Sequence, residues 1–248
     1  MEDIGLTSTK IYQIIPLSLF MMKESPISRA TVEGLVRKSV LGYLERASFG
    51  KSNGSPVGPN PLVVNISARH CHLTQESVEI LFGPGHQLTP MKWLYQEGHF
   101  AAEETVTLIG PRSRVISNLR ILGPCRSADQ VEVAYTDAIS LGFKVPVRNS
   151  GDIAGTPGCM LMGPAGFQEM REGVIRAAPH VHMSPADAAA YGVKDKDYMK
   201  LRVGGDTGIT FDRIFVREDP AVKLEVHLDT DEANACGFRP DTPCELIK

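Results

Sequence analysis

The sequence predicts a mainly β protein, built as barrels or sandwiches with short helices between the strands. From Leu62 onward, short runs rich in β-branched residues alternate with turns that contain Gly, Asn, Asp or Pro. Stretches with helical periodicity are few and short in this part of the chain. The β-rich runs are LVVNIS, EETVTLIG, RVISNLRILG, QVEVAYT, YMKLRVGG, GITFDRIFVR and KLEVHLD.

Composition and charge limit the classes of protein to which this chain can belong. Its 248 residues are 42% hydrophobic and 22% charged, which is ordinary for a globular protein with a packed core. The formal net charge is −3 and no basic stripe is present, so nucleic-acid binding is not expected. The five cysteines form no CxxC pair, which argues against a disulfide framework or a zinc ribbon and favours a reducing, intracellular location.

Residues 1–50 are predicted to form an N-terminal extension. Its apolar run Ile11–Met22 is too short to span a bilayer and lacks the flanks of a secretory signal, so no membrane association is expected. The methionines that end this run offer an alternative start. Residues 31–47 show the periodicity of an amphipathic helix, and a Gly/Ser/Pro-rich linker, 51–61, follows. A tethered helix of this kind favours a docking peptide for a partner over a helix packed on its own domain.

An internal repeat divides the β-rich part into two related units. Asn65–Gly83 and Ile175–Val193 each contain His-x-His, an apolar residue, Thr or Ser, and then a short helix-like stretch that ends near Gly. Lys223–Phe238 is a weaker copy with one histidine. Helix capping explains the shared frame, because each copy has an N-cap residue where the helix should begin. The predicted N-caps are Thr74, Ser184 and Asp229.

The paired histidines of the repeat predict a metal site. Strand alternation sends residues i and i+2 to the same face, so both imidazoles of each His-x-His motif point the same way. Two convergent imidazoles are half of a metal site, and a site with three protein ligands leaves a position open for substrate. His227 is a candidate third ligand for one pair, and Glu132 for the other. The pairs are His70 with His72 and His180 with His182.

The remaining histidines, and the cysteine between the first pair, are not expected to be metal ligands. His86 and His99 are expected to be surface or loop residues. Cys71 lies between two proposed ligands, so alternation sends it to the opposite face, where a small buried residue is expected. The Gly-rich segment Ser150–Gly166 predicts tight turns between strands, with contact to a phosphate group as the alternative.

With these residues in place, the chain resembles the PduL-type phosphate propanoyltransferases of bacterial microcompartments. The resemblance extends from about Leu62 to about Pro240 and depends on five stretches that occur in order. They are NISARHCHLT, LTPMKWL, RILGPCRSADQVEV, RNSGDIAGTPG and PHVHMSPADA.

The resemblance implies a fold of two small β-barrels with short helical caps. It implies that the first strand is swapped into the C-terminal barrel. One barrel would then comprise 62–68 together with 178–248, and the other would comprise 69–177. The active site is expected between the two barrels.

The resemblance also implies the ligands and cofactors of that site. Two zinc ions are expected per chain, with coenzyme A as a substrate. One zinc would be held by His70, His72 and Glu132, and meet the coenzyme A sulfur. The other would be held by His180, His182 and His227. Imidazole ligands by themselves suit several divalent metals. The residues that match the rest of the active site are Ser67, Lys92, Arg120, Leu122, Arg126 and Asn234.

The implied reaction is exchange of a short acyl group between coenzyme A and phosphate. Arg126 is expected to hold phosphate, because a guanidinium grips two oxygens and leaves others free, and Arg120 is the second choice. Two alternatives are a zinc-dependent acyl-CoA hydrolase and a non-catalytic β-barrel module in which zinc is a structural staple. The resemblance further implies a homo-oligomer in the lumen of a bacterial microcompartment. There the helix 31–47 would bind shell or cargo proteins.

Overall fold

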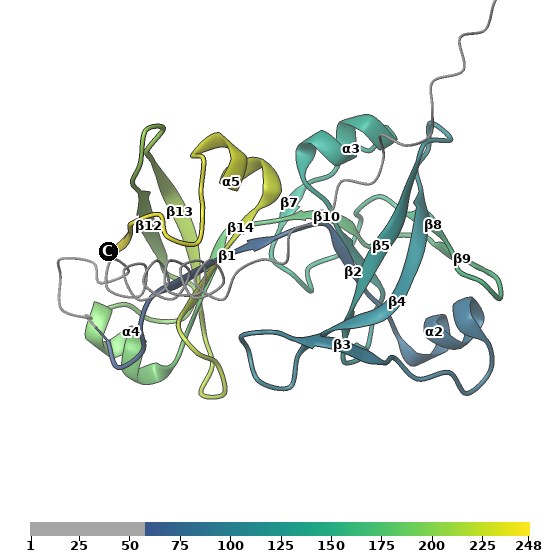
Figure 1. Cartoon of the computed structure of the whole chain (residues 1–248), viewed down its shortest axis with the longest axis horizontal. Helices are drawn as coiled ribbons and strands as arrows, with labels where there is room; N and C mark the ends of the chain where they lie inside the picture. Colours follow the sequence, from purple (N-terminus) through teal and green to yellow (C-terminus); the bar gives the residue numbers. More distant parts are fainter. Residues whose placement is uncertain (1–57) are drawn as a thin grey trace, which may run out of the picture. The chain divides into compact units, whose positions relative to one another are not determined.

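A computed structural model describes residues 58–248, and Ala47–Lys248 form one compact unit. The predicted helix over 31–47 and most of the linker 51–61 lie outside the described residues. The described part is mainly β, as predicted, with two curled sheets and short helices between strands (Figure 1). None of its helices combines the length and the apolar composition needed to cross a membrane.

The larger sheet in the described part has nine strands. Their order is β7-β10-β6-β2-β5-β4-β8-β9, with β3 paired to β4. A hydrophobic core packs against it, and the central Cys71 is fully buried there, as predicted. All five cysteines are free. The strands of this sheet and the helices between them are, in chain order, β2 (His70–His72), α2 (Gln75–Phe82), β3 (Pro90–Trp93), β4 (Phe100–Ile109), β5 (Val115–Gly123), β6 (Gln130–Glu132), α3 (Tyr135–Leu141), β7 (Val147–Arg148), β8 (Cys159–Met162), β9 (Phe167–Met170) and β10 (Val174–Ala177).

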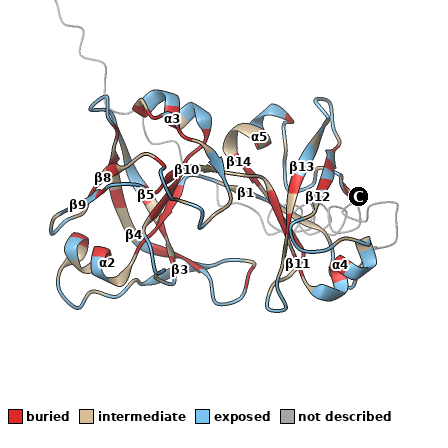
Figure 2. Ribbon diagram, turned by 180° about the vertical axis from the view of Figure 1, so that it is seen from behind, coloured by how far each residue is buried: buried red, intermediate tan, exposed pale blue. Residues whose placement is uncertain are grey.

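The smaller sheet has six strands in the order β1-β14-β11-β13-β12-β15 and a core of its own (Figure 2). The first strand, β1, runs parallel to β14, whereas the next strand along the chain, β2, belongs to the larger sheet. The chain therefore passes from one sheet to the other between β1 and β2, and again between β10 and β11. The elements are β1 (Val63–Ser67), β11 (His180–Met183), α4 (Pro185–Tyr191), β12 (Tyr198–Val203), β13 (Ile209–Glu218), β14 (Glu225–Asp229), α5 (Thr230–Ala235) and β15 (Cys244–Ile247).

The internal repeat appears in the two sheets as the same three-strand arrangement. In the larger sheet β2 lies between a parallel neighbour, β5, and an antiparallel neighbour, β6. In the smaller sheet β11 lies between parallel β13 and antiparallel β14. Each His-x-His strand is therefore central in its sheet and begins just after one of the two crossings between sheets.

One predicted strand is wrong in extent. The run QVEVAYT was expected to be a single strand, but the strand ends at Glu132 and helix α3 begins at Tyr135. The N-cap of α3 is Ala134, which offers no side-chain hydrogen bond, so the sequence carries no capping signal there. Residues 130–143 are thus a fourth copy of the strand–helix unit, paired with β2 as the β14 copy is paired with β11.

The predicted N-caps of the other three helices are confirmed. The Thr74 side chain accepts a hydrogen bond from the backbone N–H of Ser77. Ser184 and Asp229 each form a capping box, the first with Asp187 and the second with Glu232. These caps fix the chain direction immediately after each histidine-bearing strand.

Hydrogen bonds between charged groups hold the two sheets against each other. Arg176 of β10 donates from Nε to Asp229 Oδ2 at 2.7 Å and from Nη2 to Glu232 Oε1 at 2.6 Å. All three side chains are about nine-tenths buried, so truncating one of them would leave a buried charge unpaired. The junction between the sheets is therefore fixed on the side of β10 and α5.

Candidate metal centre

The first candidate cluster lies on β2 and β6 of the larger sheet. The register pairs His70 with Glu132, and His72 follows two residues later on the same face. The Nε2 atoms of His70 and His72 are 3.1 Å apart. Glu132 places Oε2 3.5 Å from His70 Nε2 and Oε1 3.9 Å from His72 Nε2. All three residues are buried, so three potential ligand atoms converge away from bulk water.

The second candidate cluster lies on β11 and β14 of the smaller sheet. The register pairs His180 with His227, and His182 follows on the same face. The ring centroids are 5.0 Å apart for His180 and His182, 4.9 Å for His180 and His227, and 5.1 Å for His182 and His227. One nitrogen of each ring lies within 4.8 Å of the others. The structure therefore brings together both of the predicted trios.

A backbone carbonyl orients the first histidine of each cluster. Nδ1 of His70 lies 2.8 Å from the carbonyl oxygen of Ala68, and Nδ1 of His180 lies 2.9 Å from that of Ala178. A carbonyl can only accept, so Nδ1 must carry the proton in each ring. The Nε2 lone pair is then left free and directed into the cluster, which is the tautomer that a metal ligand needs.

Burial keeps three of the cluster imidazoles neutral. Burial, followed by the neighbouring His70, lowers the pKa of His72 to about 3. The same two causes, burial and adjacent imidazoles, lower the pKa of His180 to about 3 and that of His182 to about 2. These rings are therefore uncharged at neutral pH, and a neutral imidazole is the form that binds a metal.

Glu132 is held as a carboxylate. Burial raises its pKa, but His70, His72 and the hydrogen bond from Ser150 together outweigh burial and lower the pKa below its ordinary value. Oε1 accepts hydrogen bonds from Gln130 Nε2 at 2.7 Å and from Ser150 Oγ at 2.9 Å. The first cluster thus combines two imidazoles with one oriented, ionised carboxylate.

These donors fit a divalent metal such as zinc. His227 carries the clearest sign, because its Nε2 is buried and has no hydrogen-bond partner among the described residues. Glu225 Oε2 lies 3.1 Å from this atom, but it is off the direction of the ring N–H and makes no hydrogen bond by geometry. A buried polar nitrogen without a partner is costly unless something binds it. Imidazole and carboxylate donors are those of catalytic zinc sites.

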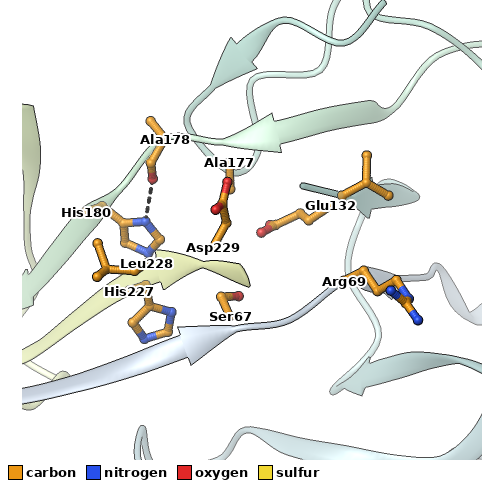
Figure 3. Close-up of a pocket in the computed structure, with 10 residues that line it drawn as sticks. Ser67, Arg69, Glu132, Ala177, Ala178, His180, His227, Leu228 and Asp229 are labelled. Atoms are coloured by element: carbon orange, nitrogen blue, oxygen red, sulfur yellow. Dashed lines mark hydrogen bonds between the residues drawn. The ribbon is translucent and has the colours of Figure 1, made fainter. Parts of the chain in front are cut away.

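A pocket connects residues of both clusters. Glu132 from the larger sheet and His180 and His227 from the smaller sheet line it (Figure 3). Figure 3 shows the Glu132 side chain extending toward the strands of the smaller sheet, whereas Arg69 points away. The lining residues are Ser67, Arg69, Glu132, Val133, Ala177, Ala178, His180, His227, Leu228 and Asp229.

The other residues expected at the active site lie in different places. Of these, only Ser67 lines the pocket. Arg120 is in register with His70, but its Nη1 donates to the carbonyl oxygens of Ala102 and Glu103 at 2.8 and 2.9 Å. Leu122 follows Arg120 on β5, Lys92 is exposed on β3, and Asn234 is exposed on α5.

Arg126 is linked to the first cluster through one hydroxyl. Its Nη1 donates to Ser150 Oγ at 3.1 Å, and Ser150 in turn donates to Glu132 Oε1. The Gly-rich segment supplies this hydroxyl, and its Gly151 N–H donates to Gln130 Oε1 at 2.7 Å. The first part of the segment turns tightly, as predicted, with Gly151 at φ 97°, but its later part contains strand β8. Its contacts orient Glu132 and place Arg126 beside it.

Histidines outside the repeat lie outside both clusters. His86 is half-buried and contacts Glu104, with Nε2 and Oε1 2.8 Å apart. His99 is exposed in the loop that precedes β4. The expectation for both residues agrees with these positions.

Four residues that surround the clusters were not predicted from the sequence. Gln130 and Ser150 hold Glu132, and Glu225 lies beside His227. Arg217 pairs in register with His182 on the adjacent strand. Strand alternation carried a signal for two of them, since Gln130 and Glu225 each stand two residues before a candidate ligand.

Comparison with known proteins identifies the family. The sequence profile of the phosphate propanoyltransferases matches residues 63–239. The phosphate propanoyltransferase of Planctopirus limnophila is 57% identical over 225 residues, covering 90% of this chain and 92% of the relative. That of Thermotoga maritima is 51% identical over 175 residues, covering 70% and 83%.

A third relative agrees with these two. The phosphate propanoyltransferase of Salmonella typhimurium is 46% identical over 178 residues, which cover 71% of this chain and 84% of the relative. The matched region contains every described strand except β15, and it contains both candidate clusters. The chain therefore belongs to the phosphate propanoyltransferase family of acyl-group transferases.

Proposed function

We propose that this chain exchanges a short acyl group between coenzyme A and phosphate at two zinc ions held by the clusters. The observation that carries the proposal is that each sheet brings together one set of metal-type donors, and that members of both sets, Glu132, His180 and His227, line one pocket. His70, His72 and Glu132 would hold one ion, and His180, His182 and His227 the other. A zinc ion supplies positive charge that lowers the pKa of a thiol and polarises a carbonyl.

The chemical step needs a phosphate oxygen, a thioester carbonyl and a leaving sulfur in one place. The phosphate oxygen attacks the carbonyl carbon, the carbon–sulfur bond breaks, and the sulfur leaves with the bonding electrons. In the reverse direction the thiolate attacks the acyl phosphate. The burial of the first cluster and of His180 favours this step, because charges interact more strongly where water is excluded.

Arg126 is proposed to hold phosphate. Its guanidinium reaches Ser150, whose hydroxyl touches Glu132, so the cation stands at the edge of the first cluster. No carboxylate among the described residues forms a salt bridge with Arg126, which leaves the guanidinium available for an anion. Arg217, beside His182, would add a second positive charge from the other sheet.

The remaining residues expected at the site are proposed to shape the coenzyme A side. Ser67 lines the pocket, and Lys92 and Asn234 offer exposed polar groups. Arg120 is proposed to act by holding β4 against β5, since its guanidinium already binds two backbone carbonyls. Leu122 would contribute an apolar contact. We also propose the division into barrels at 62–68 plus 178–248 and 69–177, because β1 shares a sheet with β11–β15 whereas β2–β10 form the other sheet.

The experiment that tests the proposed reaction is a thiol-release assay with propanoyl-CoA. Release of free coenzyme A should require phosphate and should produce an equal amount of acyl phosphate. Equal release of thiol with and without phosphate would contradict acyl transfer and indicate the hydrolase alternative.

The N-terminal extension is proposed to direct the enzyme into the lumen of a bacterial microcompartment as a homo-oligomer. The support is the amphipathic pattern of 31–47 followed by the linker 51–61. Deleting residues 1–50 should leave the specific activity unchanged and abolish co-purification with shell proteins. Packaging of the truncated chain at the level of the full chain would contradict this assignment.

A further inference from the structure

The residue two positions before the last ligand of each cluster occupies the same place in the repeat. Gln130 precedes Glu132 on β6, and Glu225 precedes His227 on β14. The registers match as well, because Gln130 is the cross-strand partner of His72 and Glu225 is that of His182. Both side chains therefore project from the face that carries the cluster.

The larger sheet shows what this position does. Gln130 is buried, and its Nε2 donates to Oε1 of Glu132 at 2.7 Å. Its own Oε1 accepts from the backbone of Gly151, so the amide cannot turn away. A carboxylate ligand only accepts hydrogen bonds, so an amide donor is the group that can orient it.

The smaller sheet has the complementary chemistry at this position. Glu225 is 3% exposed, and its Oε2 lies 3.1 Å from Nε2 of His227. Oε2 also accepts from Gln96 Nε2 at 2.6 Å, and Oε1 accepts from the side chain of Asn65. A carboxylate held from two sides is an immobile negative charge next to an imidazole ligand.

Charge explains why a carboxylate is needed at this cluster. The first cluster contains an anionic ligand, Glu132, which offsets part of the charge of a divalent ion. The second cluster has three imidazoles and Arg217 as a neighbour, so its ligands offset none. Glu225 is the buried carboxylate in direct contact with it.

We propose that Glu225 supplies the negative charge of the three-histidine cluster, where its fixed carboxylate lies beside Nε2 of His227 and offsets the charge of a divalent ion. The inference rests on the proposed function in that it requires the cluster to bind such an ion. Gln96 helps to hold the Glu225 carboxylate in place. It lies in the loop between β3 and β4 of the larger sheet, and it also bonds the backbone of Lys223 in both directions.

The test is the zinc affinity of the three-histidine cluster alone. A His72→Ala background removes one ligand of the first cluster, so the remaining zinc reports on the second. In this background, Glu225→Gln should lower zinc affinity about 10- to 100-fold, the range found when outer partners of metal ligands are replaced. Competition with a chelator of known affinity, read by metal analysis, measures the change without reference to activity.

Matched variants separate a local effect from a general one. Glu245→Gln removes an exposed carboxylate on β15 and should leave zinc affinity unchanged. In a His182→Ala background, Gln130→Ala should weaken the first cluster instead. Equal zinc affinity with and without Glu225→Gln would overturn the proposal.

Two further outcomes are also decisive. If Glu225→Gln does not fold, Gln96→Leu replaces it, because this change keeps the carboxylate and removes one of its anchors. A several-fold loss of zinc affinity is expected, and an unchanged affinity would overturn the role of a fixed carboxylate at this cluster. If the parent chain binds no zinc at either cluster, the proposed function itself fails. That result differs from the one that overturns only the role of Glu225, in which zinc binds the second cluster equally tightly with and without Glu225→Gln.

Discussion

Replacing His180 with alanine is expected to lower kcat/KM for acyl transfer about 1000-fold or more. His180 is 8% exposed and central in its cluster, with rings of two other histidines within about 5 Å. Charge stabilisation by a metal is worth several kcal/mol, and each 1.36 kcal/mol is a tenfold change in rate. The measurement is phosphate-dependent thiol release together with metal content, which should fall from two zinc ions per chain to one.

His86 provides the matched control for this substitution. It also contacts a carboxylate through Nε2, but it lies outside both clusters. His86→Gln should keep both the metal content and the rate. A His180→Ala enzyme that transfers acyl groups at the parental rate would show that the second cluster is not part of the reaction.

Replacing Arg126 with alanine is expected to lower kcat/KM for phosphate by about 100-fold or more while both metals stay bound. A charged hydrogen bond is worth about 1.5–3 kcal/mol, and a guanidinium can make two of them to one phosphate. The loss should appear as a higher KM for phosphate or a lower kcat, with the KM for acyl-CoA little changed. Steady-state kinetics in which each substrate is varied in turn measures it.

The conservative variant sharpens this prediction. Arg126→Lys keeps the charge and loses the planar fork, so its activity should lie between those of the parent and the alanine variant. Arg202→Ala removes an arginine whose contact is an exposed pair with Glu245, and serves as the control. Unchanged kinetics in Arg126→Ala would remove this residue from the phosphate site.

The cluster residues could be predicted because their signal is local. Alternation along a strand places His70 with His72, and His180 with His182, on one face without knowledge of any partner strand. The helix caps at Thr74, Ser184 and Asp229 were readable for the same reason, since a capping box is a short-range pattern.

The surroundings of the clusters could not be predicted because they depend on pairing between distant strands. Gln96 and Glu225 meet across 129 positions, and nothing in either segment specifies that contact. The hydrogen bonds that connect Arg126, Ser150 and Glu132 likewise depend on a loop whose path is set by the sheet. Local alternation fixes which face a side chain takes, whereas the register between strands decides what it meets.

The same distinction explains the error at QVEVAYT. Its alternation of apolar and polar residues extends past Glu132, so the pattern predicts a longer strand. The chain leaves the sheet after Val133, whose N–H still donates to Ile175 of β10, and helix α3 begins at Tyr135 although Ala134 gives no capping signal. The pairing of β6 with β2 reveals this segment as the counterpart of β14.

The most direct test of the account is metal analysis of the purified chain before and after stripping and refilling with zinc, with acyl transfer measured at each stage. We expect two zinc ions per chain, loss of phosphate-dependent thiol release on stripping with the β-sheet circular dichroism retained, and recovery on refilling. A stripped protein that remains fully active would contradict metal-assisted transfer. A stripped protein that unfolds would indicate that zinc is a structural staple.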